Sequence, residues 1–295
     1  MAQDLVLQAE VPVRVTHPEK LLFPDPPTTK LAYLTYVAQM AHVILPHLRN
    51  RRVTLVRCPN GTRDHRFYQR HVLTGAPEWI PSVPGEEQKP EIVIPDVATL
   101  LYYANLGAIE FHSALAHVDE TSASVLSFDL DPSTEDFERL RTVALHLHDV
   151  LDDLGLISLV KTSGKRGLQV FIPLSVAIPF SHTRKLVHFV GQYMERRWPT
   201  LVTTARLVKD RGDKVYIDVP QHGATKTLIC VYSVRATDDA RVSTPITWEE
   251  LRAGCHPTDF TIRTVPSRVK QLGDLFEPER RCDIRELVEK ITQHS

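Results

Sequence analysis

The chain has 295 residues, of which 42% are hydrophobic, and a formal net charge of −1, a composition that suits a globular protein with a buried core. It contains no apolar run of ~18 residues, and its first residues do not resemble a secretory signal, so we expect neither a membrane-spanning helix nor a signal peptide. Its four cysteines form no C-x-x-C pair, which argues against a zinc site or a disulfide framework. We therefore expect an intracellular, cytoplasmic protein with no membrane partner.

Three segments place apolar residues at helical spacing, and each is followed by a proline or a glycine that stops a helix. These segments are 29–45, 134–154 and 182–198. For the second, Ser133 and Asp136 form a capping-box pattern, so the helix is expected to start directly after Ser133. The stretch 80–95 is rich in proline and acidic residues and is expected to be a connecting loop.

Short runs typical of β-strands lie between these segments. They are 53–57, 91–94, 125–130, 158–161, 168–173, 215–219 and 227–232. Several of them follow one another directly, and they do not alternate strictly with helices. This order predicts an α+β fold, with mixed or antiparallel sheets flanked by helices, over a doubly wound parallel sheet.

The run from Val125 to Pro132 (VLSFDLDP) carries two aspartates two positions apart. Because side chains alternate along a strand, Asp129 and Asp131 share one face and stand roughly 6.5–7 Å apart along it. A solvated edge strand with two acids is the alternative interpretation of this pair alone. A third aspartate, Asp218, lies in the run 215–219, and two-metal phosphoryl transfer needs about three such carboxylates to hold Mg²⁺ or Mn²⁺.

The segment 161–169 (KTSGKRGLQ) reads as a strand, a turn and a second strand. Its two glycines let the backbone approach a ligand, and Lys165 and Arg166 offer contacts to phosphate. The spacing is not that of a P-loop, and a basic hairpin turn is the alternative interpretation. Polar and cationic residues that would balance a triphosphate also follow Asp218: Gln221, His222, Lys226, Thr227, Tyr232, Ser233 and Arg235.

The order of these motifs resembles the polymerase domain of bacterial ligase D, which belongs to the archaeo-eukaryotic primase superfamily and serves non-homologous end joining. The motifs are F-D-L-D-P, K-T-S-G-x-x-G-L, V-Y-I-D-x-x-Q and K-T-x(4)-Y-S-x-R, within a match over about 13–275. The resemblance implies a single primase-polymerase catalytic domain over 1–295. Its DNA-contacting part would cover about 1–120, and its metal and nucleotide core about 121–275.

The resemblance also implies a function and a set of partners. The function is a template-directed nucleotidyltransferase that fills gaps and extends ends at DNA double-strand breaks and adds ribonucleotides readily. The partners are DNA with gaps or broken ends that carry a 5′-phosphate, NTPs or dNTPs, and, as candidates, Ku and a separate DNA ligase. The setting would be the cytoplasm of a prokaryote, in association with the nucleoid.

Individual residues match the family's functional positions. Asp129, Asp131 and Asp218 match the catalytic triad that holds two Mn²⁺ or Mg²⁺ ions. Nucleotide contacts are implied for Ser163, Lys165, Arg166, Gln169, Gln221, Lys226, Arg235 and His112. Contacts with the 5′-phosphate of the downstream strand are implied for His17, Lys20 and Lys30. Phe67 and Tyr68 match an aromatic pair that packs on the template strand.

One position departs from the family pattern S-G-x-K-G-L-H. Gln169 stands where the family has a histidine that helps to bind the triphosphate. Glutamine donates hydrogen bonds but carries no positive charge, so we expect weaker nucleotide binding or altered catalysis with the metal site retained. Two alternative functions stay open: a primase-like enzyme that starts chains de novo, and a DNA end-bridging module with weakened catalysis.

Overall fold

The computed structural model describes residues 5–85 and 88–293, which divide into two compact units. Unit 1 contains the described residues of Met1–Ala114, Thr227–Ser243 and Phe260–Gly273, and unit 2 contains those of Leu115–Lys226, Thr244–Asp259 and Asp274–Ser295. The chain therefore leaves unit 1 at residue 114 and returns to it twice. Each unit is built on its own β-sheet.

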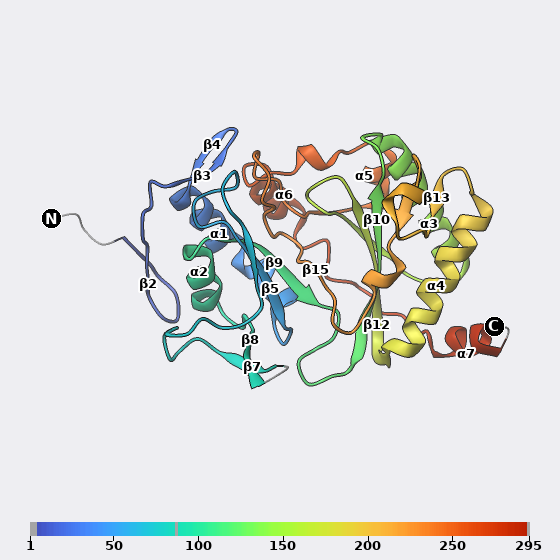
Figure 1. Cartoon of the computed structure of the whole chain (residues 1–295), viewed down its shortest axis with the longest axis horizontal. Coiled ribbons are helices and arrows are strands. Elements are labelled where there is room, and N and C mark those ends of the chain that lie inside the picture. The colour runs from blue at the N-terminus through green and yellow to red at the C-terminus, as the bar shows by residue number, and fades with distance from the viewer. Residues whose placement is uncertain (1–4, 86–87, 294–295) are drawn as a thin grey trace. The chain divides into compact units, whose positions relative to one another are not determined.

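Unit 1 contains a four-stranded antiparallel sheet with the strand order β15–β9–β5–β6. These strands are β15 (Thr227–Ile229), β9 (Ala108–Ala114), β5 (Val53–Arg57) and β6 (Phe67–Gln69). Helices α1 (Lys30–Leu48) and α2 (Val97–Asn105) pack against each other, and α2 also packs on β9 (Figure 1). The smaller elements are β1 (Val6–Leu7), β2 (Val13–Arg14), β3 (Leu21–Pro24), β4 (Pro27–Thr29), β7 (Ser82–Pro84), β8 (Pro90–Ile92) and α6 (Val265–Leu272).

Unit 2 contains a six-stranded mixed sheet with the order β13–β14–β10–β12–β11–β16. Its strands are β13 (Val202–Thr203), β14 (Val215–Ile217), β10 (Ser122–Pro132), β12 (Leu168–Pro179), β11 (Leu159–Thr162) and β16 (Pro245–Ile246). Only the β13–β14 pair among these is parallel. The helices are α3 (Phe137–Asp153), α4 (Phe180–Arg197), α5 (Trp248–Arg252) and α7 (Arg285–Gln293), with 3₁₀ turns η2 (Val208–Asp210), η3 (Val219–Gln221) and η4 (Pro257–Asp259).

In the sheet of unit 2, β10 carries the two aspartates on one face and large apolar side chains on the other. Helices α3 and α4 both pack on β10 (Figure 1). The alternate residues Leu126, Phe128 and Leu130 of β10 are completely buried, whereas Asp129 and Asp131 keep part of their surface exposed. This alternation along the strand is the one expected from the sequence, and it places the two carboxylates on a common face.

The predicted α+β class is confirmed, and the structure corrects several element boundaries. Helix α3 starts at Phe137 because Asp136, not Ser133, is its N-cap and accepts a hydrogen bond from the backbone N–H of Arg139. Helix α1 continues past Pro46 to Leu48, since Leu48 is buried in the core and holds the last turn in place. The stretch 80–95 is not a plain loop, because β7 and β8 pair within it, with residues 86–87 outside the described part.

None of the helices in the described residues is both long enough and apolar enough to cross a lipid bilayer.

Candidate active site

The sheet of unit 2 brings three aspartates together from two segments that are far apart in the sequence. Asp129 lies opposite Gln169 of β12, and Asp131 lies opposite Tyr216 of β14. Asp218 follows β14 directly, and its backbone N–H donates a hydrogen bond of 2.9 Å to the carbonyl oxygen of Asp129. Because β10 pairs directly with β14, the carboxylates of β10 lie next to the aspartate that follows β14.

The Asp218 side chain is held by its own local structure. Its Oδ1 atom accepts hydrogen bonds from the Tyr216 hydroxyl at 3.1 Å and from the backbone N–H of Gln221 at 3.2 Å. The second of these makes Asp218 the N-cap of η3. The Arg211 guanidinium lies 3.6 Å from the centroid of the Tyr216 ring and covers it.

The three carboxylates influence one another electrostatically. Burial and the negative charges of Asp131 and Asp218 raise the pKa of Asp129 well above its usual range, while a hydrogen bond from Gln169 and the positive charge of Lys161 act in the opposite direction. A divalent cation would relieve this repulsion, and carboxylate oxygens are the ligands that Mg²⁺ and Mn²⁺ prefer. Within residues 5–85 and 88–293, however, no three His, Cys, Asp or Glu side chains are already gathered into a metal-ligand set. The donor chemistry of the three aspartates fits a divalent metal ion.

The glycine-rich turn predicted to hold phosphates lies directly beside the aspartates. The Ser163 hydroxyl accepts hydrogen bonds from the backbone N–H groups of Lys165 at 3.3 Å and Gly167 at 3.1 Å. A Cβ atom on Gly167 would lie 2.7 Å from the carbonyl oxygen of Leu130 and 3.4 Å from Oδ1 of Asp131. Only glycine therefore lets the turn approach the end of β10 this closely. Arg166, at the exposed tip of the turn, forms an ion pair of 2.6 Å with Glu135.

Gln169 is buried beside Asp129 rather than exposed at the turn. It is 4% exposed; its Nε2 atom donates a hydrogen bond of 3.0 Å to Oδ1 of Asp129, and its Oε1 atom accepts one of 2.6 Å from Nζ of Lys161. Lys161 is itself 1% exposed. Lys161 was not predicted as a site residue, because a lysine close to Lys165 and Arg166 in the sequence is typical of an exposed basic patch.

The polar residues after Asp218 separate into two kinds. Gln221 is partly exposed and Lys226 is exposed, so both are accessible to a ligand. His222 is completely buried, and its ring lies 3.3 Å from the Ser127 hydroxyl and 2.9 Å from the Thr183 hydroxyl. Burial, assisted by the charge of Arg184, lowers the pKa of His222 to about 4. His222 is therefore a neutral core residue.

In unit 1, a buried carboxylate joins two of the predicted nucleotide contacts. Oε2 of Glu110 lies 2.8 Å from Nε2 of His112 and 3.3 Å from Nη1 of Arg235. Its Oε1 atom accepts a hydrogen bond of 3.0 Å from the backbone N–H of Ala236. Glu110 is 3% exposed and was missed by the sequence analysis. The available signal was its spacing of two from His112, which puts both side chains on one face of β9.

The residues predicted to bind a 5′-phosphate meet at the start of α1. Lys30 is the first residue of α1, and its backbone N–H donates a hydrogen bond of 2.7 Å to the carbonyl oxygen of Lys20. Nζ of Lys30 donates to the carbonyl oxygen of Thr16 at 2.6 Å and to its hydroxyl at 2.9 Å, while Nζ of Lys20 donates to the carbonyl oxygen of Pro59 at 3.0 Å. Burial and the positive charge of Lys20 lower the pKa of Lys30 to about 8. His17, exposed with φ of 50°, forms the turn before Lys20.

The aromatic pair predicted to contact the template occupies β6. Tyr68 is 76% exposed, so its ring is free to stack on a base. Phe67 precedes it in the strand and therefore points to the opposite face. The Phe67 ring has the Arg57 guanidinium 5.2 Å from its centroid and the His65 ring stacked at 6.0 Å. The two rings thus do not form one continuous platform.

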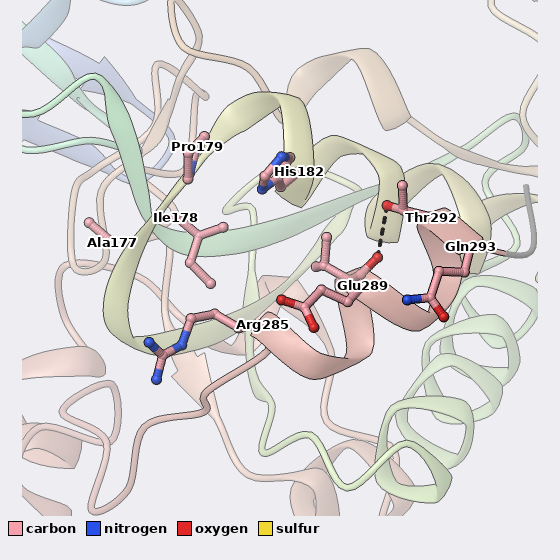
Figure 2. A pocket seen from close by; sticks show the side chains of 9 residues that line it. Ala177, Ile178, Pro179, His182, Arg285, Glu289, Thr292 and Gln293 are labelled. Carbon is pink, nitrogen blue, oxygen red and sulfur yellow. Dashed lines mark hydrogen bonds between the residues drawn. The ribbon is translucent and has the colours of Figure 1, made fainter.

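A separate surface pocket of about 440 Å³ lies where the end of β12 and the start of α4 meet α7. Figure 2 shows His182 of α4 and Glu289 of α7 among its lining side chains. Its described lining includes none of the residues predicted for catalysis or for DNA binding.

Comparisons with known proteins agree with the motifs and with the fold. The family model described as LigD, primase-polymerase domain matches residues 29–276. The chain is 35% identical to the bifunctional non-homologous end joining protein LigD of Bacillus subtilis, over 90% of this chain and 43% of that protein. It is 31% identical to the multifunctional non-homologous end joining protein LigD of Mycolicibacterium smegmatis, over 90% of this chain and 36% of that protein. The chain thus spans less than half the length of these relatives.

The fold also matches a solved structure, that of the polymerase domain from Mycobacterium tuberculosis ligase D in complex with DNA. The TM-score is 0.84 at 31% sequence identity, and the match covers 90% of this chain and 96% of that one. The motifs, the arrangement of both sheets and these matches lead to one conclusion. The chain belongs to the LigD primase-polymerase domain family.

Proposed function

We propose that this chain is a template-directed nucleotidyltransferase that fills gaps and extends ends at DNA double-strand breaks in non-homologous end joining. The proposal rests on one observation: Asp129 and Asp131 of β10 lie next to Asp218, which follows the paired strand β14, and beside the turn at Ser163. A module that only bound DNA would gain nothing from clustered acids that repel its ligand. Family membership and the DNA complex of the mycobacterial relative support the same activity.

The aspartates are the proposed ligands of two divalent ions, Mn²⁺ or Mg²⁺. When bound, such ions lower the pKa of the primer 3′-hydroxyl and stabilise negative charge on the transferred phosphoryl group. In this arrangement Asp218 has limited freedom, because Tyr216 and Gln221 hold its Oδ1 atom. Asp129 is held on one side by Gln169.

The proposed nucleotide contacts of unit 2 are Ser163, Lys165, Arg166, Gln221 and Lys226. In this scheme, Lys165 and Arg166 supply positive charge to the triphosphate, which the family pattern supports. The family motif puts position 169 in the same set, but Gln169 is buried and its amide is bonded to Lys161 and Asp129. In unit 1, His112 and Arg235 are proposed contacts whose orientation is set by Glu110.

The start of α1 is the proposed site for the 5′-phosphate of the downstream strand. Lys20 and Lys30 bring two ammonium groups to a helix N-terminus, where the helix dipole also favours an anion. His17 borders this site, and Tyr68 and Phe67 are the proposed template contacts. We further propose that the protein uses NTPs as well as dNTPs and acts in the prokaryotic cytoplasm with Ku and a separate DNA ligase.

A primer-extension assay on a gapped duplex with a 5′-phosphate, Mn²⁺ and either NTPs or dNTPs tests the proposal. Templated extension by the wild type, and its loss in Asp129→Ala, is the expected result. Asp153→Ala is the matched control, since Asp153 is exposed on α3 and should extend the primer like the wild type. Products without a primer would indicate a primase, and DNA binding without extension would indicate an end-bridging module. Full activity of Asp129→Ala would refute the metal assignment.

A further inference from the structure

Three side chains form a hydrogen-bonded row across neighbouring strands of the unit 2 sheet. Lys161 of β11 lies directly opposite Gln169 of β12, and Gln169 lies directly opposite Asp129 of β10. The register of the sheet therefore brings the three residues into line. The bonds of 2.6 Å from Nζ of Lys161 and 3.0 Å from Nε2 of Gln169 connect them in one direction, toward Asp129.

The row fixes which way the Gln169 amide faces. A lysine ammonium has three donors and no acceptor, so only the Oε1 end of the amide can face Nζ of Lys161. The NH₂ end must then face Asp129, whose carboxylate only accepts. A reversed amide would set two donors against each other at one end and two acceptors at the other, in a buried place where an unmade hydrogen bond is costly.

The surroundings of Lys161 keep it in this orientation. The residue is 1% exposed, and its ammonium lies 5.7 Å from the centroid of the Phe171 ring, a favourable cation–π distance. Gln169 is 4% exposed, and both polar atoms of its side chain take part in the row. A side chain engaged at both ends is poorly placed to reach a triphosphate.

We propose that Lys161 and Gln169 are positioning residues for Asp129: Lys161 orients the Gln169 amide, and the amide holds Oδ1 of Asp129 so that the carboxylate is presented to a divalent cation. The inference rests on the proposed role of Asp129 as a metal ligand. It gives position 169 a role that differs from triphosphate binding. Partners of a metal ligand that do not touch the metal commonly change its affinity by 10–100-fold when they are removed.

The test compares Gln169→Met and Lys161→Met, which keep side-chain length and remove the hydrogen bond. Binding of Mn²⁺ alone is measured by calorimetry or by the EPR signal of free Mn²⁺, and steady-state extension gives kcat and KM for the nucleotide. We expect each variant to bind Mn²⁺ ~10-fold more weakly, with KM for the nucleotide within about twofold of the wild type measured at saturating Mn²⁺. The double variant should bind Mn²⁺ with the same affinity as Gln169→Met, because both residues act on Asp129 through one contact.

Two results would overturn the inference. One is Mn²⁺ affinity equal to the wild type in Gln169→Met, and the other is a raised KM for the nucleotide with unchanged Mn²⁺ affinity, which would return Gln169 to the triphosphate. If Lys161→Met does not fold, Gln169→Met decides alone, since it leaves Lys161 its contact with the Phe171 ring. Failure of the proposed function gives a different result: if Asp129 is not a metal ligand, Asp129→Asn itself binds Mn²⁺ like the wild type.

Discussion

The backbone N–H of Asp218 donates a hydrogen bond of 2.9 Å to the carbonyl oxygen of Asp129. This bond continues the pairing of β14 with β10 by one step beyond the last strand residue, Ile217. It ties the backbone of the third aspartate to that of the first, so the two side chains start from adjacent points of the sheet. The two side chains are then held differently, Asp129 by Gln169 and Asp218 by Tyr216.

Removal of either ammonium at the start of α1 should abolish the preference for a 5′-phosphate. We expect Lys20→Ala and Lys30→Ala to lower affinity for a gapped duplex with a 5′-phosphate by about 10–100-fold, the usual loss of a hydrogen bond to a charged group. Affinity for the same duplex with a 5′-hydroxyl should change little. Fluorescence anisotropy measures both, with Lys270→Ala, exposed on α6, as the control. Equal losses on both duplexes would contradict a phosphate-specific site.

The same preference should depend on pH through Lys30. Since burial lowers its pKa to about 8, Lys30 is cationic below that pH and loses its charge above it. The advantage of the 5′-phosphate should therefore be full near pH 7 and decline as the pH rises through 8 and beyond, with bound phosphate moving the decline to higher pH. Lys30→Arg should remove the decline, because arginine stays protonated. A titration of affinity from pH 6.5 to 9.5 that was flat for the wild type would count against this assignment.

His222 should make the fold sensitive to acid. Its pKa is lowered from 6.5 to about 4 in the folded state, so between these values the unfolded chain binds more protons than the folded one. Stability should be full above pH 6.5 and fall as the pH drops toward 4, by at most about 3 kcal/mol. Urea unfolding of wild type and His222→Gln at pH 7 and pH 4.5 isolates this contribution, and His182→Gln, exposed on α4, is the control. The same pH dependence in His222→Gln as in the wild type would show that another group is responsible.

We expect that Gly167, in the turn after Ser163, cannot be replaced by a residue with a side chain. Its Cβ would lie 2.7 Å from the carbonyl oxygen of Leu130, so Gly167→Ala must displace the turn from β10. We expect a loss of about 1–3 kcal/mol in stability, typical of overpacking, together with a strong loss of extension activity. Gly155→Ala is the comparison, because φ of 70° strains an alanine there although its Cβ would meet no atom within 4 Å. Gly155→Ala should lower stability without lowering extension activity. Thermal melts measure the stability of both variants, and extension assays measure their activity.

The sequence predicted those features that depend on local pattern. The alternation in 125–130 placed Asp129 and Asp131 on one face, and the apolar periodicity found the three long helices. The N-cap of α3 was not predictable from the sequence, because both Ser133 and Asp136 are residue types that cap helices. The structure shows that Asp136 is the N-cap. Helix α2 was missed, because its nearly continuous apolar residues show no clear period. Strand β9 was also missed, although Ile109 to His112 alternate between apolar and polar residues.

In the site, the sequence failed mainly to predict which charged and polar side chains are buried. Lys161 and Glu110 are charged residues in short strands, and a charge in a strand normally indicates an exposed face. Their burial depends on partners at other positions of the chain, Gln169 for Lys161 and Arg235 for Glu110. The position of His222 in the core likewise follows from contacts with Ser127 and Thr183, which no local pattern reveals.

A single catalytic site formed by the three aspartates is best tested by Mn²⁺-dependent primer extension on a gapped duplex with Asp129→Asn, Asp131→Asn and Asp218→Asn. Asparagine keeps the size of each side chain and removes its negative charge, so folding and DNA affinity should be retained. We expect each variant to lower kcat by a factor on the order of 10²–10³ at saturating nucleotide, whereas Asp153→Asn should extend the primer like the wild type. Extension by the Asp218→Asn variant at the wild-type rate would contradict this expectation, because the three aspartates would then not act as one site.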